Sequence, residues 1–199
     1  MIKSIYKKNR KSMKKLILLI LMTLPILGFS QLTTTNPDTV CFGTSGSTYQ
    51  VPNTPGYIYT WVVSAPGIIN NGQGTNQIEV DWSGAIPGLI PNGVSVTATN
   101  ASGCVSPPVN LDVFIYQVLP TINTIGPFCQ SNPCVNLTGF PLGGVFSGTG
   151  VNGNQFCPQN ANLGNNSVTY TYTSAGCQFT VTTNVSVNPN PVLTPIEHD

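Results

Sequence analysis

Cysteine is the residue type in this sequence with the clearest chemistry. Six cysteines are present in the 199-residue chain, and the first of them is Cys41. An even number of cysteines is typical of disulfides in an exported chain, whereas structural zinc sites use closely spaced pairs. The last four cysteines are separated by 4, 22 and 19 residues, which does not fit paired zinc ligands. We therefore expect disulfides among Cys41, Cys104, Cys129, Cys134, Cys157 and Cys177.

The positions of the cysteines favour one pairing, although six cysteines allow fifteen and the sequence leaves the others open. In each half of the chain a Gly-Cys dipeptide follows a polar turn, and another cysteine lies well upstream of it. One bond in each half is the simplest arrangement, and the remaining two cysteines would form a second bond in the second half. The pairing expected on this basis is Cys41–Cys104, Cys129–Cys177 and Cys134–Cys157.

Two carboxylates, Glu79 and Asp81, have the spacing of a candidate acid–base pair. Inverting glycosidases use two carboxylates on either side of a sugar, and such a pair also needs a cleft and a raised pKa on one member. Here the two acids alternate with apolar residues on a predicted short strand. We therefore expect a solvated strand face; calcium binding is a lesser alternative, because no DxDxDG loop is present.

The remaining motifs do not predict the residues of an enzyme active site. Residues 148–153 match GxGxxG, but the dinucleotide fingerprint requires a helix next, and residues 154–158 do not have a helical pattern. We expect a β-turn region that uses the backbone freedom of glycine. His198 is the only histidine and lies in the tail, away from any candidate nucleophile. We expect no catalytic residue, no metal and no cofactor.

The basic residues are confined to one end of the chain. All seven lysines and arginines fall within the first fifteen positions and precede an apolar run at 16–27. This pattern predicts a signal peptide over residues 1–30, with Met13 as an alternative start. The chain from Gln31 onward then carries six acids and no basic side chain, which makes nucleic acids and anionic membranes poor partners. We expect an exported chain with no membrane insertion, at the outer surface or outside the cell, with the periplasm as an alternative.

Short alternating segments separated by Gly, Pro and Asn predict an all-β chain. Trp61 and Trp82 fall on the inward faces of their strands, so we expect core packing for both rings. Two β-sandwich domains are expected, at 31–118 and 119–188, followed by a linker-like tail at 189–199. The strands expected are 57–63, 77–82, 93–99, 110–118, 135–138, 145–146, 155–157, 167–173 and 178–187.

Several of these segments also carry a family resemblance. They are Val40–Gly43, Tyr59–Val63, Gly72–Asn76, Ile78–Trp82, Val94–Val96, Asn100–Cys104, Pro141–Val151, Phe156–Pro158, Thr169–Thr173 and Gly176–Cys177. Together they resemble tandem PKD-like and immunoglobulin-like repeats of Bacteroidota exported cell-surface proteins. The departures are an added cysteine pair, Cys134 and Cys157, and the absence of a recognisable C-terminal sorting domain. The chain is therefore either a short standalone protein or the front of a longer one.

The resemblance implies a non-catalytic structural or adhesive module at the cell surface, with a protein or glycan as its partner. A carbohydrate-binding module is the alternative and needs exposed aromatic rings, with Trp61 and Trp82 as candidates; a glycosidase is a third. The tripeptide around Thr39, Asp-Thr-Val, fits a short O-glycosylation pattern of such secreted proteins.

Overall fold

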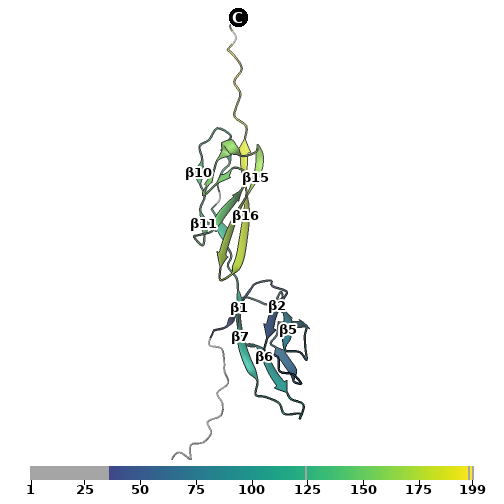
Figure 1. Cartoon of the computed structure of the whole chain (residues 1–199). Helices are drawn as coiled ribbons and strands as arrows, with labels where there is room; N and C mark the ends of the chain where they lie inside the picture. The colour runs from purple at the N-terminus through teal and green to yellow at the C-terminus, as the bar shows by residue number, and fades with distance from the viewer. Residues whose placement is uncertain (1–35, 124, 197, 199) are drawn as a thin grey trace, which may run out of the picture.

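The structure is a computed structural model that describes residues 36–123, 125–196 and 198. The predicted signal peptide, residues 1–30, lies outside the described residues, as do Glu197 and Asp199. The regular structure of the described part of the chain is β-strand, apart from one helical element, the 3-10 helix η1, Pro158–Asn160 (Figure 1). This confirms the all-β prediction, which rested on β-branched and aromatic residues alternating with polar ones.

Two sheets form the N-terminal half of the chain. The larger has the strand order β1-β7-β6-β3, and the smaller has the order β2-β5-β4. Strand β1 runs parallel to β7, while β6 pairs antiparallel with both β7 and β3. The strands of this half are β1 Asp38–Cys41, β2 Ser47–Gln50, β3 Ile58–Val63, β4 Ile68–Asn71, β5 Gln77–Asp81, β6 Gly88–Thr99 and β7 Val109–Tyr116.

The two N-terminal sheets enclose one apolar core. Alternation along β3 and β5 buries every second side chain, as a two-residue period requires. Trp61 is 4% exposed and Trp82 is fully buried, which confirms the expected core packing of both rings. Because both sheets contribute to this cluster, the half is a β-sandwich. Its buried members are Val40, Tyr49, Tyr59, Trp61, Ile78, Val80, Trp82, Ala85, Val94, Val96, Val113 and Ile115.

The C-terminal half repeats this plan on a smaller scale. Its main sheet has the order β12-β15-β16-β9, which faces a three-stranded sheet, β10-β14-β13, and a two-stranded one, β11-β8. A separate apolar cluster lies between them and contains Phe146, Phe156, Tyr170 and Val185. The strands are β8 Thr121–Ile122, β9 Phe128–Cys129, β10 Val135–Asn136, β11 Gly139–Phe140, β12 Val145–Gly148, β13 Val151–Asn152, β14 Gln155–Phe156, β15 Gly164–Ser174 and β16 Cys177–Asn188.

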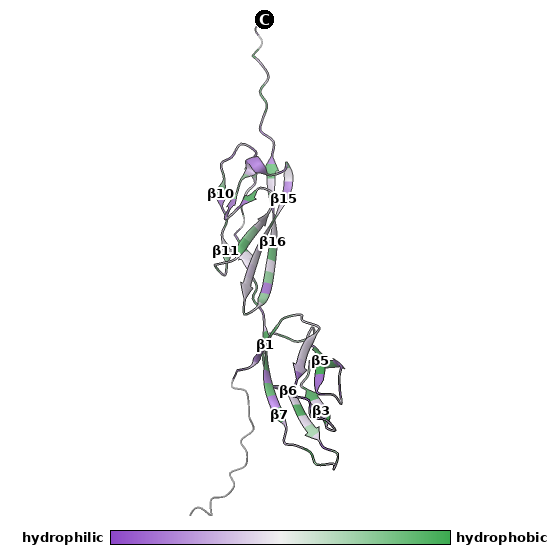
Figure 2. Cartoon of the chain, in the orientation of Figure 1, coloured by the Kyte–Doolittle hydropathy of each residue, from purple (hydrophilic) through white to green (hydrophobic). Residues whose placement is uncertain are grey.

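The halves are stacked end to end, and we call this elongated arrangement the rod (Figure 1). The β15–β16 hairpin points its turn toward the N-terminal half, and residues 117–120 connect β7 to β8 across the joint. Apolar segments alternate with polar ones along the strands of both halves (Figure 2). Within the described residues, no helix is long and apolar enough to cross a membrane.

The strands that were not expected from the sequence are the short ones. Seven of them, β1, β2, β4, β8, β9, β11 and β13, have two to four residues each. Each of these strands has at most one buried side chain, which is too few for a two-residue period to be recognised. These strands are fixed by pairing with longer neighbours, as β1 is by β7.

Candidate functional site

A disulfide between Cys41 and Cys177 joins the two halves of the rod. Cys41 is the last residue of β1, and Cys177 is the first residue of β16. Their Cα atoms are 5.5 Å apart, and Cys177 is only 1% exposed. The bond therefore sits inside the joint, where it connects the end of the N-terminal sandwich to the hairpin turn of the C-terminal one.

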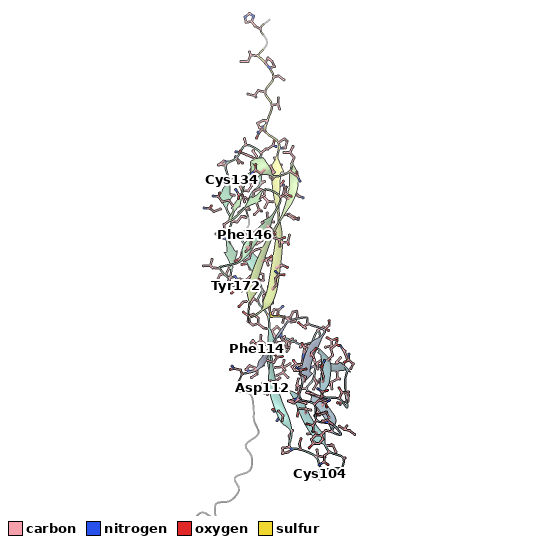
Figure 3. All side chains as sticks on the ribbon, in the orientation of Figure 1. Cys104, Asp112, Phe114, Cys134, Phe146 and Tyr172 are labelled. Carbon is pink, nitrogen blue, oxygen red and sulfur yellow. A yellow bond between two sulfur atoms is a disulfide. The ribbon has the colours of Figure 1, made fainter. Side chains whose placement is uncertain are left out.

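The contacts around this disulfide involve Tyr116, which lies opposite Cys41 in the β1–β7 register. The Tyr116 hydroxyl donates a hydrogen bond to Ser174 Oγ at 3.1 Å. Its ring meets Phe179 edge-on, with the ring centroids 5.7 Å apart. In addition to the disulfide, one hydrogen bond and one aromatic pair therefore connect β7 to the C-terminal half. Figure 3 shows Phe114 and Tyr172 on either side of this joint.

The structure contradicts two of the expected pairings, Cys41–Cys104 and Cys129–Cys177. Cys104 and Cys129 are unpaired and exposed. The reason is strand length: Cys129 lies beside the last residue of β16, whereas Cys177 is its first. Eleven steps along a strand span about 37 Å, and a disulfide needs Cα atoms within roughly 7 Å. Two cysteines at opposite ends of one sandwich cannot bond to each other.

The second disulfide, Cys134–Cys157, is the pairing expected from the sequence. It lies wholly within the C-terminal half, where it ties the segment before β10 to the residue after β14. Cys157 is 3% exposed and directly precedes η1. This bond supports a half in which most strands are short and the apolar core is small.

The two candidate carboxylates, Glu79 and Asp81, are both held by local hydrogen bonds. Glu79 accepts a bond from the Asn71 side-chain amide at 3.0 Å. Asp81 accepts one from the backbone N–H of Ser83 at 2.7 Å, and hydrogen bonds from the Ser83 side chain and backbone lower the pKa of Asp81. A general acid needs a raised pKa, so Asp81 does not fit that role.

The GxGxxG segment at 148–153 connects β12 to the β13–β14 hairpin. It is followed by the strand residues Gln155 and Phe156, so the helix that a dinucleotide site needs is absent from this position. Gly148 has φ +138°, and a Cβ there would lie 2.2 Å from the Ser167 carbonyl oxygen. Glycine is needed at this position because the two strands approach each other too closely for a Cβ atom.

The remaining predicted residues lie apart from one another. Thr39 is exposed on β1, so its hydroxyl is accessible to a modifying enzyme. His198 is exposed in the tail beyond β16. Within 36–123, 125–196 and 198, no three His, Cys, Asp or Glu side chains gather closely enough to hold a metal ion.

A buried polar contact that the sequence did not indicate connects the two N-terminal sheets. The Tyr49 hydroxyl donates to Asp38 Oδ2 at 3.0 Å and accepts from Trp82 Nε1 at 3.1 Å. Burial, followed by the charge of Asp38 and the hydrogen bond to it, raises the pKa of Tyr49 well above its usual value. The contact fastens β1 to β2 and orients the largest core ring.

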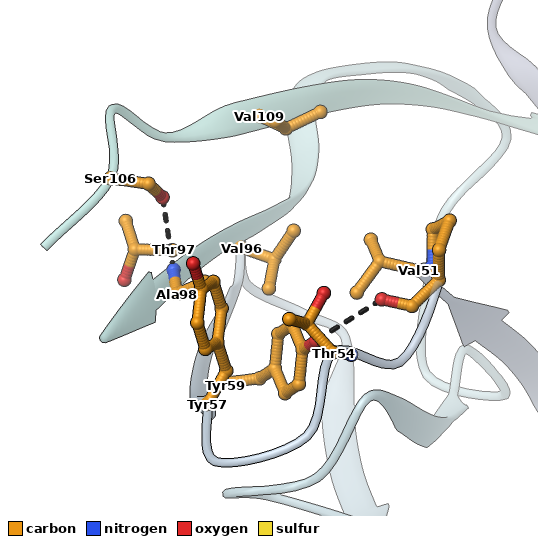
Figure 4. Close-up of a pocket in the computed structure, with 10 residues that line it drawn as sticks. Val51, Thr54, Tyr57, Tyr59, Val96, Thr97, Ala98, Ser106 and Val109 are labelled. Carbon is orange, nitrogen blue, oxygen red and sulfur yellow. Dashed lines mark hydrogen bonds between the residues drawn. The ribbon is translucent and has the colours of Figure 1, made fainter. Parts of the chain in front are cut away.

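A shallow apolar hollow of about 190 Å³ lies in the N-terminal half (Figure 4). Tyr57 and Tyr59 line it together with Val96 and Val109. The Tyr59 hydroxyl accepts from the Thr54 backbone N–H at 2.8 Å and donates to the Pro52 carbonyl at 3.1 Å. That hydroxyl is therefore committed to the loop, which leaves the hollow with little polar chemistry for a ligand.

One family model matches part of the chain. Residues 30–113 match the family model described as a PKD-like domain, which covers the N-terminal sandwich as far as β7. No curated protein matches the chain. The N-terminal half is therefore similar to a PKD-like domain.

Three solved structures are similar to the chain at low identity. Fibronectin(III)-like modules of Clostridium thermocellum CbhA have 13% identity and a TM-score of 0.32, over 82% of this chain and 95% of that one. Titin domains Z1Z2 in complex with telethonin have 20% identity and a TM-score of 0.26, over 82% and 96%. Extracellular domains 3–5 of Drosophila OTK have 14% identity and a TM-score of 0.28, over 79% and 59%.

Proposed function

We propose that this chain is an exported, non-catalytic structural module that keeps a fixed length between its two ends at the cell surface. The two domains are 31–118 and 119–188, preceded by the signal peptide 1–30 and followed by the linker-like tail 189–199. The observation that supports this function is the Cys41–Cys177 bond, which crosslinks the halves at their joint. An adhesive contact to a protein or glycan would be displayed at the end of such a module.

The course of the chain explains why this bond suits a load-bearing role. Strand β1 ends at Cys41 at the joint, and β16 begins at Cys177 at the same joint and runs away from it. A pull on the two ends of the chain therefore passes along β1, through the disulfide and along β16. The segment between the two cysteines, which are 136 residues apart in the sequence, is bypassed and carries no load.

The load-bearing segments are already extended. A β-strand rises about 3.3 Å per residue, close to the limit of roughly 3.3–3.6 Å for a fully stretched chain. Pulling on β1 and β16 can therefore release little new length, even where their hydrogen bonds break. With the disulfide intact, the rod should resist extension far better than two tethered domains.

Single-molecule pulling on the chain from Gln31 onward, through peptide tags at its two ends, tests the function. The oxidised protein should show no length gain from the bypassed segment. Reduction should add roughly 450–490 Å, which is the stretched length of 136 residues. The double variant C41S/C177S should gain roughly 370–410 Å without reductant, because the intact Cys134–Cys157 bond still bypasses 23 residues of that segment. The variant C134S/C157S should behave like the parent when oxidised, because that bond lies inside the bypassed segment. A full-length gain from the oxidised parent would refute the load-bearing role.

The export part of the proposal is tested separately in the native host. Intact mass of the secreted or surface fraction should show a chain that begins at Gln31, and a glycan on Thr39 would appear as added mass. A chain that retains residues 1–30 inside the cell would refute export.

The carbohydrate-binding alternative has less support. Both tryptophans are buried and donate their ring N–H groups inside the protein, Trp61 to the Thr75 carbonyl and Trp82 to Tyr49. Neither ring can form the flat exposed platform that sugar stacking needs.

A further inference from the structure

The two unpaired cysteines lie at opposite ends of the rod. Cys104 precedes β7, whose last residue, Tyr116, is at the joint, so Cys104 is at the far end of the N-terminal half (Figure 3). Cys129 lies beside Asn188, the last residue of β16, at the far end of the C-terminal half. Two sandwiches with 12-residue strands place these thiols on the order of 75 Å apart, so they cannot bond within one chain.

Cys129 occupies the same structural position as Cys41. Each lies on a short strand that runs parallel to the last long strand of its half, β9 along β16 and β1 along β7. The residue after each cysteine donates its backbone N–H to that long strand at 2.9 Å, Phe42 to Tyr116 and Gln130 to Asn188.

The turn that follows each of these cysteines is also the same. The carbonyl of Cys41 accepts the N–H of Thr44 at 3.1 Å, and the carbonyl of Cys129 accepts that of Asn132 at 3.0 Å. The two sulfur atoms are therefore presented by equivalent backbone frames, at the equivalent ends of two sandwiches.

Cys104 and Cys177 lie in corresponding connections of the two halves, although Cys177 is the first residue of β16 and Cys104 precedes β7 by five residues. Each follows the turn between the two central antiparallel strands of its half, β6–β7 and β15–β16. The residue before each is a glycine with positive φ, Gly103 at +81° and Gly176 at +76°. The main sheets have matching strand orders, β1-β7-β6-β3 and β9-β16-β15-β12, so the two turns protrude from equivalent ends.

We propose that Cys129 of one copy of this chain forms a disulfide with Cys104 of a second copy, so that copies join head to tail. The bond would repeat between chains the linkage that Cys41 and Cys177 make within one chain. The two surfaces are different, and the contact leaves a free Cys104 at one end and a free Cys129 at the other. A head-to-tail contact that does not close on itself generates an open chain of copies.

Bond formation requires a disulfide donor, which we specify as a small-molecule disulfide such as oxidised glutathione. The thiolate of Cys129 attacks one sulfur of the donor, which releases one glutathione thiolate and leaves a mixed disulfide. The thiolate of Cys104 from the second copy then attacks the Cys129 sulfur and releases the second glutathione. The two cysteines lose two protons and two electrons in total, and the donor is reduced to two thiols.

The contact should depend on the covalent bond. At the internal joint, Tyr116 contributes a hydrogen bond and an aromatic pair. At the free end of the C-terminal half, the residue opposite Cys129 is Asn188, which has no ring. The surfaces at the two ends therefore lack the noncovalent contacts of the internal joint, and reduction should separate the copies.

The test uses the chain from Gln31 onward in an oxidised-glutathione buffer, followed by non-reducing gels and light scattering. The parent should form a ladder of oligomers that reductant returns to monomer. The variants C104S and C129S should each remain mainly monomeric, and a one-to-one mixture of the two should stop at a dimer. Because no Lys or Arg follows position 15, crosslinked peptides are mapped with a protease of other specificity.

The peptide map decides between the named outcomes. A Cys104–Cys129 crosslink between chains, with Cys41–Cys177 intact, supports the proposal. Three results would overturn it. The parent could remain monomeric, either single variant could form as much dimer as the mixture, or Cys104–Cys104 could be the main crosslink. None of these outcomes depends on the pulling experiment, which concerns the Cys41–Cys177 bond alone.

Discussion

Removal of the Cys41–Cys177 bond should turn the stiff joint into a hinge. Without the bond, the halves retain the Tyr116–Ser174 hydrogen bond and the Tyr116–Phe179 ring pair. The hydrogen bond contributes about 0.5–1.5 kcal/mol and the ring pair about the same, so together they stabilise the closed joint by roughly 1–3 kcal/mol. The closed joint also keeps the linker, residues 117–120, in one conformation.

The entropy of that linker decides the outcome. Fixing the backbone of four residues costs about 1–2 kcal/mol each, or roughly 4–8 kcal/mol, which exceeds the contact energy. The difference is at least about 1 kcal/mol, and every 1.4 kcal/mol corresponds to a factor of ten in population. In C41S/C177S most molecules should therefore have an open joint, whereas each half remains folded around its own core.

The unpaired cysteines allow a direct measurement of this hinge. Cys104 and Cys129 are exposed at the two ends of the rod and accept spin or fluorescent labels without further substitution. The parent should give a narrow distribution of distances between the labels, and C41S/C177S should give a broad one that extends to shorter values. The matched control is C134S/C157S, which should remain narrow. An equally narrow distribution in C41S/C177S would show that the noncovalent contacts suffice and that the energies above are wrong.

Two further predictions concern the cores. Replacement of Tyr49 by Phe leaves the buried Trp82 N–H without its acceptor and should lower the free energy of unfolding by about 1–3 kcal/mol in denaturant titrations. Burial raises the pKa of Tyr49. The stability that protonated Tyr49 contributes is therefore complete below the unfolded pKa of about 10 and is lost as pH rises through the higher folded value. Y49F should remove this loss of stability at alkaline pH. In the other half, G144A places a Cβ 2.4 Å from Tyr170 Cζ and should lower the free energy of unfolding by about 1–3 kcal/mol. The control G84A places a Cβ that meets nothing within 4 Å and should be neutral. Equal effects of the two substitutions would contradict the packing.

The sequence predicted the long strands and the cores because their residues alternate with a clear period. Along β5, Ile78 and Val80 are buried, as the alternation indicates. Burial of Trp61 and Trp82 followed from the same reasoning. The fold class could therefore be predicted from single residues and their spacing, with no knowledge of how the strands pair.

The joint could not be predicted in this way, because its cysteines lie on strands too short to have a pattern. Cys41 belongs to a four-residue strand with one fully buried side chain, and Cys129 belongs to a strand of two residues. Their parallel pairing with β7 and β16 fixes them at the opposite end of the sandwich from the hairpin turns. Each half has an early cysteine followed by a later Gly-Cys, and this order suggested a bond within each half, although the same order also fits a bond between neighbouring halves.

The position of Cys104 and Cys129 also determines how a head-to-tail chain of copies would carry force. In such a chain, the covalent path through one copy leads from Cys104 along β7, across the linker and on to Cys129, which is 25 residues. Fully stretched, that path measures roughly 83–90 Å, only slightly more than the span of about 75 Å between the two thiols. Each copy could therefore lengthen by little before its covalent path is taut. The internal disulfide protects the same joint in parallel, because β1 is hydrogen-bonded to β7 before the linker and β16 is hydrogen-bonded to β9 after it. A single linkage geometry, used once within the chain and again between chains, would give an assembly of nearly fixed length.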